Sequence, residues 1–310
     1  MNCKQLLPHI VTATLLTICT LGFHSCFTGV EGTGKITISK KEAGILAPSA
    51  EDRLLSDIKP SLLKEWGPGR LLLVTDDKLR LITENTGMPV NQGDTVCFKE
   101  IMARHGADGL EKAVLVFNHD GGILTFPLDK NISEAKESVT ASDLAMLIDL
   151  EAVEKVRERL KGKKVWTKTS LWYGDSLRHV KGRKFVPVTI SDIEAGNSFF
   201  PVMVSFIDDE GARGRLLMSI GSAGNDSRSF GRLFSLKDPR DNYRQISDSN
   251  WAAIQNEQLI AGMTKEECRL SRGNPSDVNV GHDYTNTMEI WYYPNGSYLR
   301  FVDGLLVSFK

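Results

Sequence analysis

The chain has 310 residues, and its 38 Lys and Arg against 39 Asp and Glu give a formal net charge of −1. This balance, and the lack of a basic block with interleaved aromatic residues, argue against a nucleic-acid partner. The length predicts about two domains with a composition typical of a soluble globular protein. No apolar run after the N-terminal segment is long enough to span a bilayer.

Residues 1–25 have the pattern of a secretory signal peptide. One charged residue, Lys4, precedes the apolar-rich run 6–23, which is short for a spanning helix and lacks a stop-transfer flank. The following Leu-Gly-Phe-His-Ser-Cys of residues 21–26 resembles the lipobox of bacterial lipoproteins, although Phe23 and His24 depart from the tighter pattern. This resemblance implies cleavage before Cys26, a diacylglyceryl group on its thiol and an acyl chain on its new amine. A cleaved signal beside an incidental cysteine is the less favoured alternative.

The segment 26–65 is expected to link this anchor to the first folded unit. Residues 27–35 contain three glycines and would form a flexible tether, and Ser56 or Asp57 with Pro60 can start a short helix. The mature chain keeps two further cysteines, Cys97 and Cys268. We expect small buried thiols there rather than the bridge that an oxidising compartment would permit.

Residues 66–132 are predicted to form a small β-barrel. Short apolar runs at 71–75, 79–83, 95–101, 114–117 and 123–128 are separated by turn residues. Strands this short and close together suggest a closed barrel or a rolled sheet. The pair Asp76-Asp77 lies between two of these runs and is predicted to be a solvated hairpin tip.

A helix is predicted over 138–161. Thr140 or Ser142 can cap it, Gly162 can end it, and its apolar stripe contains Leu144, Leu147, Ile148, Val153, Val156 and Leu160. The simplest role is packing between two β units, and a partner-binding helix is the less favoured alternative.

Residues 161–225 echo the first β unit. The segments 182–187, 202–207 and 215–220 repeat the pattern of 93–98, 114–117 and 123–128 at a nearly constant offset. We interpret this as a second small barrel, both barrels being SH3-like, with chance similarity among hairpins as the alternative. Asp208-Asp209-Glu210 is again predicted to be a solvated hairpin tip.

Residues 246–310 carry the clearest local signals. A run of capping residues, 247–250, precedes Trp251. Thr264 and Glu267 have the spacing of a capping box, and Gly273 can end that helix before Pro275. The period then changes to two, with strands expected at 288–293, 297–302 and 305–309. Two helices on one face of a three-stranded meander are therefore predicted.

These C-terminal motifs resemble the SmpA/OmlA (BamE-like) domain of small outer-membrane lipoproteins. The resemblance covers about the last fifth of the chain and rests on Trp251, on the segments 262–267 and 273–275, and on 290–293 and 301–307. It implies a two-helix, three-strand α+β fold and a role in outer-membrane integrity or barrel-protein assembly. The same topology occurs in β-lactamase inhibitor proteins, so an inhibitor role also stays open. The expected architecture is multidomain, mainly β plus α+β, with two joined barrels before this domain.

No catalytic or metal-binding pattern is evident. The histidines of the mature chain share no short ligand spacing with each other, with Cys or with carboxylates: His105, His119, His179 and His282. There is no nucleophile elbow, P-loop or Rossmann glycine pattern. We therefore expect neither an enzyme nor a bound cofactor or metal.

Aromatic residues are the better indication of function. Trp166, Trp172 with Tyr173, and the Trp291 face of the C-terminal strand, which also includes Tyr293, cannot all be buried if every strand has a solvent side. Trp and Tyr are enriched at binding hot spots, so a protein or glycan surface is one hypothesis. The alternative, that these rings close barrel ends or pack between domains, is somewhat favoured.

Together these features predict a lipid-anchored protein of the Gram-negative outer membrane, on its periplasmic face or at the cell surface. The membrane, through the lipid, and other envelope proteins would be its partners, and it would bind them noncovalently. Inhibition of a periplasmic or extracellular enzyme is the second hypothesis, and an envelope hydrolase is the least supported.

Overall fold

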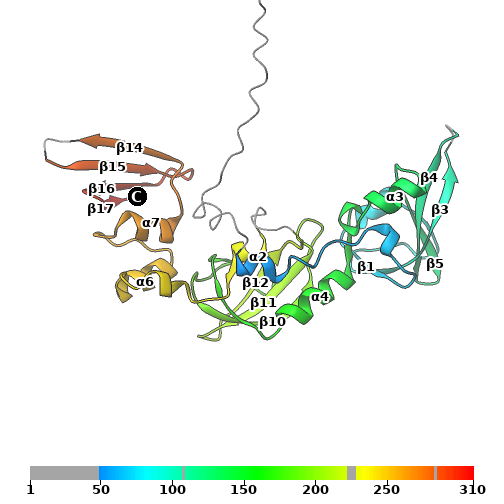
Figure 1. The fold of residues 1–310 in the computed structure, drawn as a ribbon, viewed down its shortest axis with the longest axis horizontal. Helices are drawn as coiled ribbons and strands as arrows, with labels where there is room; N and C mark the ends of the chain where they lie inside the picture. Colours follow the sequence, from blue (N-terminus) through cyan, green and yellow to red (C-terminus); the bar gives the residue numbers. More distant parts are fainter. Residues whose placement is uncertain (1–48, 107–108, 222–227, 283–284) are drawn as a thin grey trace, which may run out of the picture. The chain divides into compact units, whose positions relative to one another are not determined.

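The computed structural model describes residues 49–310 except 107–108, 222–227 and 283–284. It is mainly β, with two curled antiparallel half-barrel sheets and a C-terminal four-stranded antiparallel sheet with short helices (Figure 1). The predicted signal peptide, Cys26 and the tether lie outside the described residues. No helix within the described ranges is long and apolar enough to cross a membrane.

The first described helix, α2 (Ala50–Leu54), begins earlier than predicted. Its start is fixed by Ser49, whose hydroxyl accepts the Asp52 amide at 3.1 Å while the Asp52 carboxylate accepts the Ser49 amide. Beyond it, Leu55 and Ile58 are buried in the core of the second half-barrel. The short 3-10 helix η1 (Leu63–Glu65) then leads into the first half-barrel, where Leu63 joins the core.

The first half-barrel has six strands in the order β2-β5-β4-β3-β1-β6. Their bounds are β1 Leu71–Val74, β2 Glu84–Thr86, β3 Thr95–His105, β4 Glu111–His119, β5 Gly122–Pro127 and β6 Leu147–Asp149. Alternating apolar residues point inward, so that Leu72, Val96 and Phe117 are buried in one cluster. The sheet therefore extends beyond the predicted limit at residue 132, because β6 joins its edge.

The strand predicted at 79–83 is wrong. A 3-10 helix, η2 (Asp77–Leu81), occupies most of this segment, because the Asp76 carboxylate accepts the Lys78 amide at 2.9 Å and starts a helical turn. Leu79 is buried and Leu81 is 82% exposed. Asp76 is therefore a cap rather than a hairpin tip.

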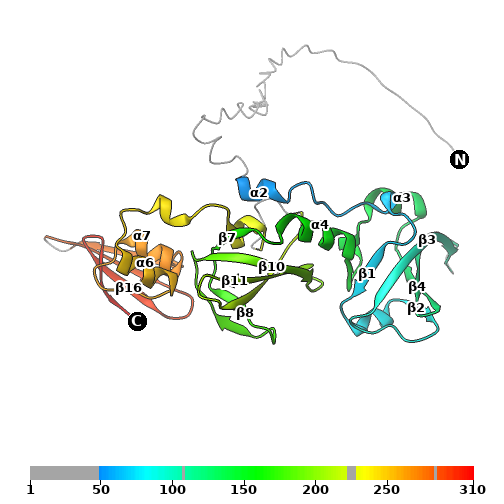
Figure 2. The ribbon, with the colours of Figure 1, turned by 90° about the horizontal axis from the view of Figure 1, so that it is seen from below.

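The helix predicted over 138–161 is also wrong in its first half. The segment contains the end of α3 (Ile132–Ser138), the 3-10 helix η3 (Ala141–Asp143), the edge strand β6 and then α4 (Leu150–Leu160). Asp149 caps α4 by accepting the Glu151 amide at 3.1 Å. Apolar residues at 144, 147 and 148 fit a helical stripe as well as a buried strand, so periodicity alone could not separate the two. Helix α4 packs on β10 of the second half-barrel (Figure 2).

The second half-barrel has seven strands in the order β13-β7-β10-β11-β12-β8-β9. Their bounds are β7 Lys164–Thr167, β8 Leu171–Tyr173, β9 His179–Lys181, β10 Pro187–Ala195, β11 Val202–Asp208, β12 Arg213–Met218 and β13 Phe234–Ser235, with helix α5 (Phe230–Leu233) before β13. The sheet thus continues past the predicted limit at residue 225.

The two half-barrels share one strand topology. With the extra β9 set aside, β1 to β6 occupy the same places as β7, β8, β10, β11, β12 and β13. Strand β3 has a bulge after Phe98 and β10 has one after Ile190. Just before β1 the Gly69 amide donates to the Phe98 carbonyl at 2.8 Å, and before β7 the Gly162 amide donates to the Ile190 carbonyl at 2.8 Å. The two half-barrels therefore match in strand order, in the position of a bulge and in one backbone hydrogen bond, whereas a resemblance among hairpins would concern neighbouring strands alone.

The C-terminal part confirms the two helices and corrects the sheet. Its helices are η4 (Pro239–Asn242), α6 (Asp248–Gln255) and α7 (Lys265–Arg272), and its strands are β14 Asp277–His282, β15 Thr287–Tyr292, β16 Tyr298–Val302 and β17 Leu305–Phe309. The capping box of Thr264 and Glu267 is present, and Gly273 ends α7 at φ 83°. Four strands replace the predicted three, because β14 pairs with β15. All residues of β14 are exposed, and its sequence lacks the apolar run that marks the other strands, so the sequence pattern does not predict it.

Both cysteines in the described part are free thiols. Cys268 is fully buried under α6 and the sheet, and burial raises the pKa of its thiol to about 12. Cys97 on β3 is half-buried. The prediction of a small buried thiol is therefore confirmed for Cys268 and only in part for Cys97.

Candidate functional site

Two of the four aromatic residues predicted to form a binding surface are core residues. Trp172 is 3% exposed, and its ring meets Phe206 edge-to-face at 5.0 Å while its indole N–H donates to the Thr169 carbonyl at 2.8 Å. Trp291 is fully buried, with Phe301 at 4.7 Å and the Arg269 guanidinium 4.7 Å above its ring. The prediction that these two tryptophans face a partner is wrong.

The two tyrosines and Trp166 are half-buried. Tyr173 packs against His179 at 4.5 Å between ring centres, and the Tyr293 hydroxyl donates to the Gly273 carbonyl at 3.1 Å. Burial raises the pKa of Tyr293. Tyr173 belongs to the second half-barrel sheet, whereas Tyr293 follows β15 of the C-terminal sheet. The structure therefore gives these rings packing roles and does not join them into one surface.

The second predicted hairpin tip, at 208–210, does lie in the turn between β11 and β12, but its first residue is buried in an ion-pair network. The Asp208 side chain is only 1% exposed; its carboxylate accepts the Glu210 and Ala212 amides and pairs with Arg183 at 2.8 Å. Arg183 also pairs with Asp209 at 3.1 Å and with Glu210 at 2.5 Å. Asp208 therefore holds the turn in shape, and only its two neighbours face solvent.

The best-buried histidine of the described residues has a structural partner. His119 is buried, and its Nε2 lies 3.2 Å from the Asp94 carboxylate, which ties the β4–β5 hairpin to the loop before β3. In the ranges that the structure describes, no group of three or more His, Cys, Asp or Glu is placed to hold a metal ion.

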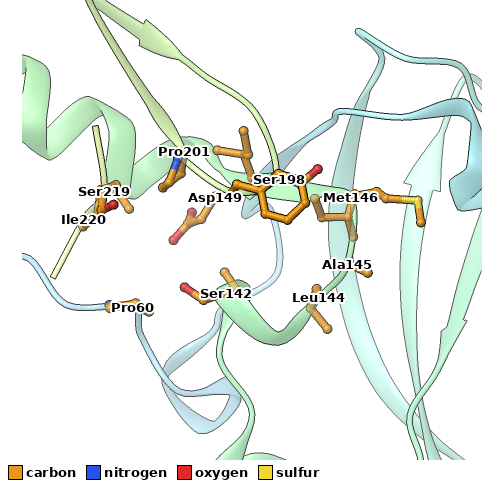
Figure 3. Close-up of a pocket in the computed structure, with 15 residues that line it drawn as sticks. Pro60, Ser142, Leu144, Ala145, Met146, Asp149, Ser198, Pro201, Ser219 and Ile220 are labelled. Carbon is orange, nitrogen blue, oxygen red and sulfur yellow. The ribbon is translucent and has the colours of Figure 1, made fainter. Parts of the chain in front are cut away.

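A cavity of about 300 Å³ lies where the two half-barrels meet (Figure 3). Its walls come from the segment 141–149, the start of α4, the turn between β10 and β11, and the residues after β12. Most lining side chains are apolar, namely Pro60, Ala141, Leu144, Ala145, Met146, Leu147, Ile148, Ala152, Phe199, Pro201 and Ile220. Its size and lining make it the candidate site, since ligand pockets are concave and mostly apolar with a few placed polar groups.

Among the described residues that line the cavity, Asp149 is the only ionisable one. Figure 3 shows its carboxylate and the Ser142 side chain both directed into the space. The Asp149 carboxylate also pairs at 2.5 Å with Arg70, a residue that does not line the cavity, and Arg70 pairs with Glu151 at 2.8 Å. The Arg70 and Asp149 side chains are only 8% and 6% exposed, so this pair lies largely out of water.

Three features at the rim are unusual for a purely structural surface. Phe199 is 86% exposed, and its turn is fixed because the Asn197 side chain accepts the Phe199 and Phe200 amides at 3.0 and 2.9 Å. Met146 has φ 65°, in the left-handed region that costs a bulky residue about 1–3 kcal/mol. The Ser219 hydroxyl is buried and has no hydrogen-bond partner in the described part of the chain.

This site is not evident in the sequence, because its residues come from four separate segments and only the fold brings them together. One available signal was the Phe199-Phe200 pair, which stands between turn residues and Pro201. The chain matches no family model, no curated protein and no solved structure.

Proposed function

We propose that the protein is a lipid-anchored component of the Gram-negative cell envelope that binds another polypeptide noncovalently, in outer-membrane assembly or integrity. The observation that carries the binding role is the apolar cavity with a single carboxylate. Both oxygens of Asp149 already accept hydrogen bonds, from Arg70 and from the Glu151 amide, and the lining residues that the structure describes include no Cys, His or Lys. Such an arrangement suits recognition better than proton transfer or nucleophilic attack.

The fold supports the proposal by analogy alone. The shared topology of the half-barrels favours two SH3-like units that arose by duplication, joined by α4. The C-terminal helices, capping box and meander favour a BamE-like domain to which β14 adds an edge strand. The anchor itself rests on the sequence around Cys26.

Enzyme inhibition stays a second candidate because of the C-terminal sheet. Its strands β15 and β17 carry exposed apolar side chains, with Tyr292 38%, Leu305 48% and Val307 43% exposed. Affinity purification from detergent-solubilised envelopes separates the two roles. Barrel-assembly components should co-purify if the protein acts in assembly, whereas a single soluble hydrolase would favour inhibition.

The anchor is tested with Cys26→Ser. We expect the wild-type protein to pellet with membranes and the variant to move to the soluble or culture fraction, because acyl chains supply roughly 0.8 kcal/mol for each buried methylene. Cys97→Ser is the matched control and should pellet like the wild type, since Cys97 lies on β3 of the folded part. A Cys26→Ser protein that stays as firmly in the membrane pellet would contradict the lipid assignment.

A further inference from the structure

We infer that the cavity beside Asp149 binds an extended peptide segment of a partner protein, with one apolar side chain inserted and main-chain N–H groups beside it. This inference rests on the proposed function and names the site and the class of partner. The contributing residues are those that line the cavity, and none of them belongs to the predicted anchor.

The size and lining of the cavity set the first limit on the occupant. Its volume of about 300 Å³ is at the lower end of the range for ligand pockets, roughly 300–1,000 Å³. There is room for one or two side chains but not for a large cofactor. Walls made of Leu144, Met146, Ile148 and Ile220 favour an aliphatic or aromatic group.

The polar groups set the second limit. The described part of the lining contains hydroxyls at Ser142, Ser198 and Ser219, the Asp149 carboxylate and no cationic side chain. A hydrogen-bond donor is therefore complementary to the site, and the unpartnered Ser219 hydroxyl offers it a buried partner. An anionic group, such as a fatty-acid carboxylate or a lipid phosphate, would find no free cation in this described part, because Arg70 is paired with Asp149 and Glu151. Main-chain N–H groups next to an apolar side chain meet both requirements.

Strand β6 offers an edge along which the peptide can lie. Among the described strands it pairs with β1 alone, at the end of its sheet, and its three residues are buried and line the cavity. An extended segment can lie along such an edge, since strand addition combines main-chain hydrogen bonds with a pocket for a side chain. On the opposite wall, the exposed Phe199 ring provides a rigid aromatic contact of the kind that dominates binding energy.

The test uses the mature full-length protein in detergent and a phage library of random nine-residue peptides. Enriched peptides are synthesised with a fluorophore, and their affinities are measured by anisotropy. We expect peptides that share one apolar anchor. Ala145→Trp, which places a large ring at an exposed lining position, should weaken binding about tenfold or more, and Phe199→Ala about fivefold to tenfold.

Two matched variants control for general surface effects. Leu81→Ala removes a side chain as exposed as Phe199, and Ala103→Trp adds a ring at an exposed position on β3, both outside the lining. Both should bind within about twofold of the wild type. Thermal melting of every variant checks that the fold is kept.

Three results would overturn the inference. The first is that no peptide is enriched from the library. The second is that the enriched peptides bind Ala145→Trp as tightly as the wild type. The third is that laurate displaces the peptides from the wild type and binds Ala145→Trp more weakly than the wild type. In the second case an envelope partner that still co-purifies would leave the proposed function standing with its site elsewhere. Failure of the proposed function is recognised separately, by a Cys26→Ser protein that remains membrane-bound.

Discussion

Replacing Asp149 by alanine should lower the free energy of unfolding by about 3–5 kcal/mol, because it leaves the Arg70 guanidinium buried without its closest partner. The Asp149 carboxylate is 2.5 Å from Arg70, and both side chains are more than nine-tenths buried. The substitution also removes the cap of α4, whose Glu151 amide the carboxylate accepts. Urea denaturation followed by tryptophan fluorescence measures the change.

Two further variants isolate the cause. Glu151→Ala removes the other partner of Arg70. Because the Glu151 side chain is 50% exposed, this substitution should lower the free energy of unfolding by less than about 1 kcal/mol. Arg70→Met with Asp149→Leu removes both charges and should recover much of the loss, since a buried pair often breaks even against apolar residues of similar size. A loss below about 1 kcal/mol for Asp149→Ala would show that the pair is hydrated.

Trp291→Ala should cost about 3–5 kcal/mol, the range for removing a fully buried large aromatic side chain. The indole fills the space between α7 and the sheet, with Arg269 above its ring and its N–H donating to the Glu289 carboxylate. Loss of the ring therefore also leaves Glu289, which is 9% exposed, with one partner fewer. Differential scanning calorimetry measures the effect.

Tyr292→Ala is the matched control, because it lies next in sequence on the opposite face of β15 and is 38% exposed. It should cost less than about 1 kcal/mol. A Trp291→Ala protein that keeps its stability but loses an envelope partner would contradict the burial and restore the surface interpretation.

Local signals predicted much of the C-terminal fold. Thr264, Glu267 and Gly273 act within a single helix. The Thr264 and Glu267 side chains accept backbone amides three residues away, and Gly273 supplies the positive φ at which the helix ends. The strands β15 to β17 were likewise predictable from their alternation and turns. These features depend on neighbours in the chain and hardly on the rest of the molecule.

The failures concern features that distant segments decide. The apolar spacing in and around β6 fits a helix, but the segment forms a strand because it pairs with β1. Strand β14 has few apolar residues and exists through its ladder with β15. Which face of β15 is buried depends on where α6 and α7 pack, so the alternation alone left open whether Trp291 is a surface or a packing residue. The cavity requires four segments at once, and only Phe199 gave a local hint of it.

Photocrosslinking in living cells can show whether the membrane-tethered protein holds a partner segment in the cavity beside Asp149. A photoreactive amino acid replaces Ala145 in the lining or, as control, the exposed Leu81 on η2. We expect one discrete protein adduct in the membrane fraction from position 145 and none from position 81. Equal labelling from both positions, or no adduct from position 145, would contradict it.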